Sequence, residues 1–287
     1  MLRPREIKRK IAAIENTRKI TRTMEMVATA RATRNQSRLK SAVPYAEALE
    51  HLYELWKRYL PPSHPLLRRT EYPRRAALLV VTSNRGLCGA YNTDILRLAE
   101  ERIGGLEESG CRVRLYVAGK RGIRRLCFLG WDLHWKSSEL DDRPSWEQSC
   151  ALADRLRDDF EHREVDLVEV VSMRFYSPGN EEACVTQMLP ISYEAPGKEE
   201  EPLMEGPREV FAVELLRAVL RMRLFRLLLE AGTSEQFARR IAMRAATENA
   251  EEMIKQYRLA YYRARQSSIT LELMDIIGGA NALREQG

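Results

Sequence analysis

The sequence predicts an α/β domain combined with a long antiparallel coiled coil formed by the two ends of the chain. Two terminal segments, 1–60 and 208–287, carry apolar or small side chains at helical spacing. Between about 74 and 195, short apolar runs alternate with helical patterns, which is typical of a mostly parallel sheet. We therefore expect an N-terminal helix at 1–60, an α/β domain at 74–195, and a C-terminal helix at 208–287 that pairs with the first.

The first helix is expected to begin at Pro4, since proline is common in the first helical turn. The basic, acid-poor start is similar to a transit peptide, but a helix that begins this early favours a mature N-terminus. Pro44 should kink or interrupt the helix, and Pro61-Pro62 should end it. One stripe at helical spacing shrinks from isoleucine to small residues: Ile7, Ile11, Ile14, Thr17, Thr21, Met24 and Ala28.

The middle of the chain reads as strands and helices in alternation. Strands are expected at 76–81, 113–117, 165–172 and 183–191, and helices at 93–105, 119–129 and 145–162. The last two strands are separated by RFYSPGNEE and are expected to form a hairpin at one edge of the sheet. A polar linker at 194–207 marks a boundary or a flexible loop.

The last segment contains no proline after Pro207, and only Gly232 interrupts its pattern. Such a long helix must pack on another helix, on another chain or against water. Its first stripe consists of Val213, Leu216, Leu220, Leu224 and Leu227. A second stripe of mostly small residues predicts a coiled-coil seam: Ala250, Met253, Tyr257, Ala260, Ala264, Ser267, Leu271 and Met274.

Charge and composition narrow the classes of protein. The net charge is +6, and residues 1–40 hold twelve Lys or Arg against three Asp or Glu, which indicates an acidic partner surface or nucleic acid. Nucleic acid is disfavoured because residues 1–40 contain no aromatic side chain. The longest apolar run, at 76–81, is far shorter than the roughly 20 residues of a membrane span.

No pattern in the sequence predicts an active site or a metal site. Five cysteines at wide spacing form no ligand motif and are expected to be reduced. The four histidines, at 51, 64, 134 and 162, are scattered. The loop SNRGLCGAYN at 83–92 follows a strand and precedes a helix, but it lacks the Lys-Ser/Thr of a P-loop and the dinucleotide spacing. A structural turn or subunit contact is favoured there; an α/β enzyme that binds a nucleotide at this loop is the alternative.

Three blocks of sequence resemble the gamma subunit of F-type ATP synthases, the central rotor shaft. They are IENTRKITRTMEMVATAR at 14–31, TSNRGLCGAYN at 82–92, and AMRAATENAEEMIKQYRLAYYRARQSSITLELMDIIGGANAL at 242–283. The third block is long and specific. Departures from the family pattern are Thr23 where Ala is usual, Asn84 where Asp is usual, and Leu271 where Gln is common.

This resemblance implies a non-catalytic subunit without a cofactor. The coiled coil would stand inside a ring of alpha and beta subunits, and the α/β domain would be a foot on the membrane c-ring beside the epsilon subunit. Rotation driven by ion flow would pass through the shaft to the catalytic ring. The protein would be peripheral, at the cytoplasmic face of a bacterial inner membrane. The departures leave open a paralogous gamma subunit, including one from a sodium-translocating F-type ATPase, and more distantly a non-rotary coiled-coil adaptor.

The resemblance also assigns expected roles to single residues. An apolar bearing is expected within 276–283, at Ile276, Ile277 and Leu283. The foot loop would comprise Arg85, Gly86, Leu87, Cys88 and Gly89. Contacts between rotor and ring are expected at Met24, Arg239, Gln266, Thr270 and Glu272.

Overall fold

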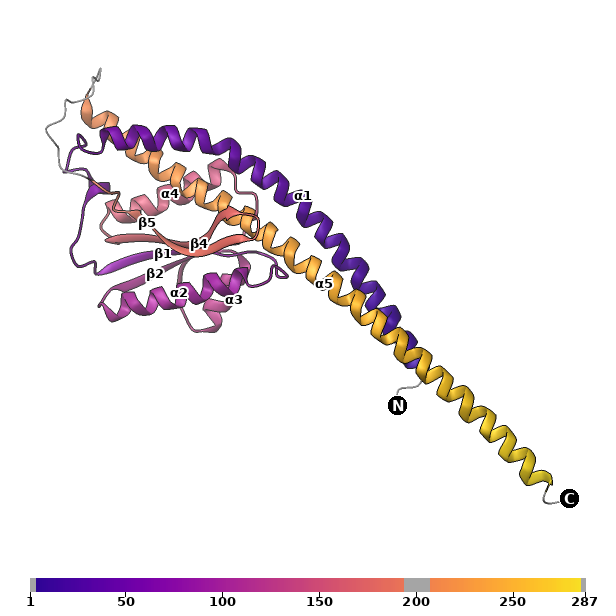
Figure 1. Cartoon of the computed structure of the whole chain (residues 1–287). Coiled ribbons are helices and arrows are strands. Elements are labelled where there is room, and N and C mark those ends of the chain that lie inside the picture. The colour runs from indigo at the N-terminus through magenta and orange to yellow at the C-terminus, as the bar shows by residue number, and fades with distance from the viewer. Residues whose placement is uncertain (1–3, 194–206, 285–287) are drawn as a thin grey trace. The chain divides into compact units, whose positions relative to one another are not determined.

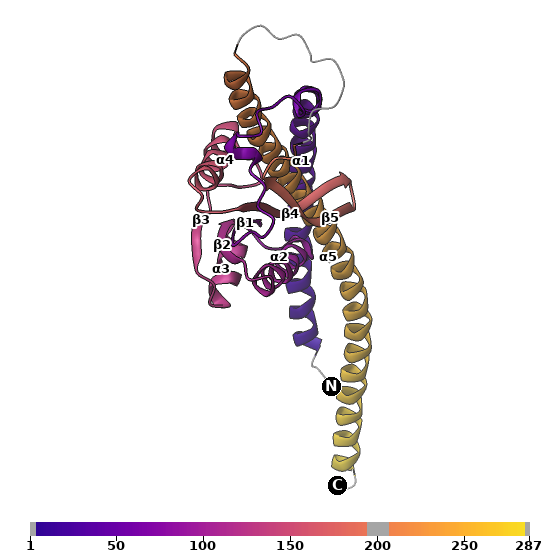
Figure 2. The same ribbon diagram turned by 90° about the vertical axis from the view of Figure 1, so that its left-hand side faces the viewer.

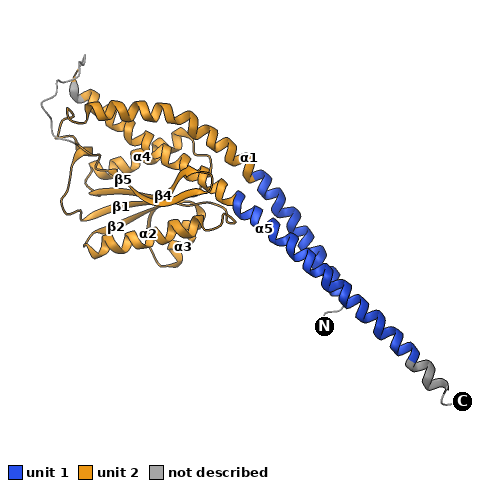
Figure 3. Cartoon of the chain, in the orientation of Figure 1, with its two compact units in different colours: residues 1–27, 240–287 blue, residues 28–239 orange. Residues whose placement is uncertain are grey.

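The computed structural model describes residues 4–193 and 207–284, with side chains at all these positions except 208, 209 and 278–284. The chain divides into two compact units (Figure 3). Unit 1 comprises Met1–Val27 and Arg240–Gly287, and unit 2 comprises Ala28–Arg239. Unit 2 thus contains, besides the α/β domain expected at 74–195, the second half of the first helix and the first part of the last.

Helix α1 runs from Pro4 to Trp56 and ends a few residues before Pro61-Pro62. The expected interruption at Pro44 is wrong, because the helix continues through this residue, while the alternative expectation of a kink stays a prediction. Proline removes the hydrogen bond to the carbonyl four residues earlier. Both Pro44 and Lys40 are exposed, so water can bond the carbonyl that loses its partner.

One five-stranded sheet in the order β3-β2-β1-β4-β5 lies in unit 2 (Figures 1 and 2). The first four strands in this order run parallel, and β5 pairs antiparallel with β4, which confirms a mostly parallel sheet with a hairpin at one edge. Strand β3 is absent from the sequence prediction, because it is short and its exposed His134 and Lys136 break the apolar signal. The bounds are β1 Arg75–Val81, β2 Arg112–Ala118, β3 Leu133–Ser137, β4 Leu167–Ser177 and β5 Asn180–Leu189.

Helices cover both faces of the sheet (Figure 2). Alternate side chains of β1 divide between two cores: Leu78 and Val80 pack with the side chains of α2 and α3, whereas Ala77 and Leu79 pack with those of α1, α4 and α5. The helices are α2 Tyr91–Glu108, α3 Lys120–Phe128, α4 Trp146–Glu161 and α5 Arg208–Arg284, with a short 3-10 helix η1 at Pro65–Leu67.

Helix α5 extends over 77 residues, and Gly232 does not interrupt it. In unit 2 its predicted stripe is buried from Leu216 to Leu227, whereas Val213 is 37% exposed. Among the described helices, none combines the length and the apolar character that a membrane span requires.

In unit 1, the start of α1 lies antiparallel to α5. Buried Thr21 and Thr247 share a hydrogen bond of 2.9 Å across the pair. The predicted seam is wrong at Met253, which is 44% exposed, because Ile254 is the buried residue. Ion pairs flank the seam at Arg18–Glu251 (3.8 Å) and Glu15–Arg258 (2.9 Å). A close approach of the two backbones through small seam residues stays a prediction. Further predicted seam residues on α5 that are instead exposed are Ala260, Leu271 and Met274; Thr17 of the α1 stripe is exposed as well.

Candidate functional site

The loops that follow β1, β2 and β3 meet at the carboxyl edge of the sheet, where Asn84 ties them together. Its side-chain oxygen accepts a hydrogen bond from the backbone nitrogen of Lys120 at 3.0 Å. Its side-chain nitrogen donates to the backbone oxygens of Ser138 at 3.0 Å and Leu140 at 3.1 Å. An ionised Asp could not donate the last two bonds, so asparagine suits this arrangement of loops.

The foot loop, Arg85–Gly89, is held from inside by Ser83 and Asn92. The Asn92 side-chain oxygen accepts from the Ser83 backbone nitrogen at 3.0 Å, and the Ser83 hydroxyl donates to the Arg85 carbonyl at 2.6 Å. Cys88 is buried, and burial raises the pKa of its thiol. Leu87 is 62% exposed with φ at 63°, a conformation that is uncommon for leucine. The loop thus holds one apolar side chain in solvent at a conformational cost, as functional loops often do.

The crevice at the carboxyl edge of the sheet, where open α/β sheets commonly bind ligands, is filled by α5. Tyr91 is buried, and its hydroxyl donates a hydrogen bond of 3.1 Å to the Ala231 carbonyl. The void between the strand ends and the segment from Leu228 to Glu235 measures about 10 Å³. Ligand pockets typically measure about 300–1,000 Å³. This void between α5 and the strand ends is therefore too small for a nucleotide.

Buried Arg239 of α5 holds the foot loop. One terminal guanidinium nitrogen lies 2.7 Å from a Glu235 carboxylate oxygen, and it donates to the carbonyls of Arg85 at 3.3 Å and Gly86 at 3.5 Å. Arg239 is 7% exposed and Glu235 is 7% exposed. The Arg239 side chain therefore bonds within its own chain, whereas the family resemblance implies a contact with another subunit.

Burial raises the pKa of Glu235 above its ordinary value of 4.5, with Asp142 and Asp141 adding repulsion and Arg239 opposing the shift. The folded state therefore binds a proton more tightly than the unfolded state. Glu235 contributes stability below pH 4.5 that is lost as the pH rises through its folded pKa.

We expect Glu235→Gln to flatten the decline of the unfolding free energy above pH 4.5, because the variant has no proton to lose. Urea unfolding of both chains between about pH 4 and 8 measures this slope. The exposed Glu248→Gln substitution is the control. Equal slopes for wild type and Glu235→Gln would contradict the argument.

A second polar contact joins α1, α5 and the loop after β3, and we call it the junction: Asn35, Asp142 and Gly232. Asn35 is 2% exposed, and its side-chain nitrogen donates to the carbonyls of Asp142 at 2.8 Å and Gly232 at 3.1 Å. This junction was not predicted from the sequence. Asn35 continues the helical spacing of the small residues Ala28 and Ala32, and a polar residue in such a stripe was the available signal.

The other predicted ring contacts lie in unit 1. Met24 is half-buried, and Gln266, Thr270 and Glu272 are exposed on α5. The Thr270 hydroxyl donates to the Gln266 backbone carbonyl within the helix at 3.0 Å, and the Gln266 side chain is exposed.

The apolar end of α5 is exposed in unit 1. Ile276 is 68% exposed and Ile277 is 54% exposed. Leu283 of the predicted bearing lies outside the residues whose side chains the structure describes. Other exposed apolar residues of this helix end are Leu259, Tyr262, Ile269, Leu271, Leu273 and Met274.

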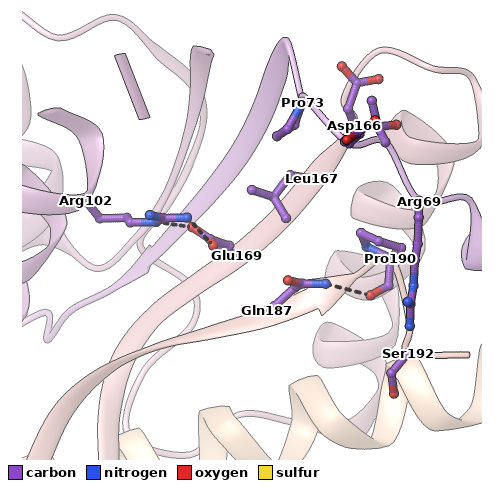
Figure 4. Close-up of a pocket in the computed structure, with 11 residues that line it drawn as sticks. Arg69, Pro73, Arg102, Asp166, Leu167, Glu169, Gln187, Pro190 and Ser192 are labelled. Atoms are coloured by element: carbon purple, nitrogen blue, oxygen red, sulfur yellow. Dashed lines mark hydrogen bonds and ion pairs between the residues drawn. The ribbon is translucent and has the colours of Figure 1, made fainter. Parts of the chain in front are cut away.

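A hollow of about 700 Å³ lies at the opposite edge of the sheet, beside the start of β4 (Figure 4). Its main charges are paired within the chain. Arg102 meets both carboxylate oxygens of Glu169 at 2.7 Å, and Asp166 accepts from the backbone nitrogens of Arg74 and Arg75. This hollow brings together none of the predicted site residues. Within the described ranges, no cluster of three or more His, Cys, Asp or Glu could hold a metal ion, and all five cysteines are free.

The chain is similar to known proteins over nearly its whole length. A family described as ATP synthase matches residues 3–283. An ATP synthase gamma chain of Leptospira biflexa is 37% identical over 288 residues, covering 99% of this chain and 100% of that protein. One from Gemmatimonas aurantiaca is 36% identical over 289 residues, with the same coverage.

Solved structures show the same fold at lower sequence identity. A chain of the Euglena gracilis mitochondrial ATP synthase has a TM-score of 0.70 and 17% identity, covering 98% of this chain and 94% of that one. A chain from the central stalk and c-ring structure of the Tetrahymena thermophila mitochondrial enzyme has a TM-score of 0.60 and 19% identity, covering 79% and 99%.

Proposed function

This chain belongs to the ATP synthase gamma chain family, and from this premise we propose how its surfaces serve as the central shaft of a rotary enzyme. The protein is a non-catalytic, central-stalk subunit of an F-type ATP synthase. It transmits rotation between an ion-driven membrane ring and the catalytic ring. The chemistry takes place in other subunits, which fits a crevice that α5 fills.

The single observation that carries the proposal is the apolar end of α5. From Ile269 to Ile277, isoleucine, leucine and methionine side chains are exposed. Burial of one such side chain contributes about 1.5–3 kcal/mol, so this surface favours a partner that surrounds the helix. We propose that a collar of alpha and beta subunits surrounds it, with Ile276, Ile277 and Leu283 in the apolar bearing.

Further ring contacts would come from Met24, Gln266, Thr270 and Glu272. These side chains are exposed or half-buried and belong to unit 1. Small or polar contacts of this kind bind each orientation of a shaft weakly, which rotation requires. Coupling then depends on modest differences of contact energy among rotor positions, typically about 1–3 kcal/mol.

The α/β domain of unit 2, at 74–195, is proposed to be the foot, which binds the membrane c-ring and the epsilon subunit. Its foot loop presents exposed Arg85 and Leu87 toward a partner, while Cys88 and Arg239 support the loop from inside. These partners would place the protein at the cytoplasmic face of a bacterial inner membrane. The coupling ion, proton or sodium, binds in the membrane ring and not on this chain.

Reconstitution tests the proposal against the non-rotary adaptor. The chain is mixed with alpha and beta subunits from its own source, and ATP hydrolysis is assayed with a bead attached to the foot. A stoichiometric complex with unidirectional rotation supports the shaft. Failure to assemble with well-folded partners favours the adaptor.

We expect Met24→Lys to lower ATP-driven ion pumping per ATP hydrolysed. The new ammonium group would make ionic contacts with ring carboxylates and hold one rotor orientation by about 1–3 kcal/mol, the size of typical coupling energies. Met26→Lys is the control, because Met26 is 60% exposed and lies two residues away on another side of α1. Unchanged pumping by Met24→Lys would count against the contact.

Removal of residues 276–287 should lower the torque of the assembled enzyme without unfolding the foot. The described side chains of Ile276 and Ile277 are exposed and belong to unit 1. Bead rotation against viscous load measures the torque, and amide exchange of the β-strands reports the foot. Loss of strand protection in the truncated chain would contradict this division of roles.

A further inference from the structure

We propose that the junction of Asn35, Asp142 and Gly232 is the clamp that locks the two shaft helices to the foot and carries torque between them. Asn35 lies on α1, Gly232 on α5, and Asp142 in the loop after β3. One amide side chain therefore bonds two elements besides its own helix. The inference rests on the proposed shaft function and names residues that perform it.

One face of α1 contacts the loop after β3 through side chains on three successive turns. Arg31 lies 3.5 Å from an Asp142 carboxylate oxygen, Asn35 bonds the Asp142 carbonyl, and Arg38 donates to the Pro144 carbonyl at 2.9 Å. These residues are spaced by four and three along the helix, so they share one face. The loop is thereby fixed along the axis of α1.

Gly232 fixes the same loop against α5. A Cβ added at Gly232 would lie 2.6 Å from the Asp142 carbonyl oxygen, so only glycine permits this approach. The approach leaves the Gly232 and Asp142 carbonyls within reach of one amide nitrogen. Both hydrogens of that nitrogen are used, which sets the orientation of the Asn35 side chain.

The directional hydrogen bonds of the junction are important because apolar packing alone offers little resistance when one helix slides along another. Around Asn35, the buried apolar side chains of α1 are Ala28, Ala32 and Leu39; the two alanines are small and give the helix little resistance to a shift of register. A buried polar residue in a helix seam fixes one register. Torque on a two-helix shaft drives the helices past each other, and the junction lies within two turns of the ends of unit 2 at Ala28 and Arg239.

The test uses the complete ATP synthase carrying Asn35→Leu or Asn35→Ser, reconstituted in lipid vesicles. The matched control is Ser149→Ala, which removes a buried hydrogen bond of 2.8 Å from the first turn of α4 to the carbonyl of its N-cap residue Ser145, a bond that joins neither α1 nor α5. Two lost bonds in Asn35→Leu should accelerate amide exchange of α5 around Gly232 by about 30-fold, or about 2 kcal/mol. ATP-driven pumping per ATP hydrolysed should fall in both Asn35 variants and not in the control.

Each outcome bears on a different claim. Faster exchange with a lower pumping ratio supports the clamp. Faster exchange with an unchanged ratio, or a ratio that falls equally in Ser149→Ala, overturns it and leaves Asn35 a stabilising residue. Unchanged exchange in Asn35→Leu also overturns it. If the wild-type chain itself fails to rotate in its complex, the proposed shaft function fails instead.

Discussion

Arg239→Met should destabilise unit 2 by about 3–5 kcal/mol, the usual consequence of removing one partner from a buried ion pair. The Arg239 and Glu235 side chains are only 8% and 9% exposed. Without the guanidinium, the Glu235 carboxylate would stay buried beside Asp142 and Asp141 with no cation. The foot loop would also lose its bonds from α5 to the carbonyls of Arg85 and Gly86. Urea unfolding of the whole chain measures the loss.

Arg244→Met provides the matched control for that variant. Arg244 and Glu248 form the same four-residue-spaced pair on α5, but their side chains are 71% and 63% exposed. Exposed pairs of this kind contribute little to stability because water screens the two charges, so Arg244→Met should change stability far less than Arg239→Met. A similar loss of unfolding free energy in both variants would show that the burial of Arg239 does not determine its contribution to stability.

Gly232→Ala should destabilise unit 2 by about 1–3 kcal/mol, although alanine normally stabilises a helix interior. The added Cβ would meet the Asp142 carbonyl oxygen at 2.6 Å, where backbone and not a flexible side chain must move. Displacement of this loop also breaks the bonds of Asn35. Thermal and urea unfolding of the chain measure the effect.

Gly104→Ala is expected to change stability in the opposite direction. Gly104 lies inside helix α2, and a Cβ there would have nothing within 4 Å. The substitution should stabilise the chain by about 1 kcal/mol through helix propensity. If the two alanine variants shift stability in the same direction, close packing at Gly232 is not the reason for its glycine.

The predicted helices and most strands were confirmed because their signals are local. Apolar spacing at 213–227 required nothing beyond the helical period, and α5 follows it through Gly232. Strand β3 was missed because a short edge strand with exposed His134 carries little apolar signal. Ile254 replaced Met253 in the seam because two candidate stripes lie side by side on α5, and packing against α1 selects between them.

The candidate site, too, could be predicted from the sequence only in part. The loop at 83–92 was recognised as special from its glycines and its place after a strand, and the structure shows what fills its crevice. Arg239 was expected on the surface. The spacing of residues along α5 cannot show that the foot loop, which follows a strand far away in the sequence, covers this side chain. Asn35 and Asp142 were missed because they are 107 residues apart.

By itself, the sequence determined the two long helices, the α/β domain between them and the family of the chain, because helical spacing and motifs are written in neighbouring residues. Only the tertiary structure decided which polar residues are interior. Burial of Arg239, Glu235 and Asn35 depends on loops and helices that meet from distant parts of the chain. The energy of a charge or an amide depends on those surroundings far more than on its own residue type.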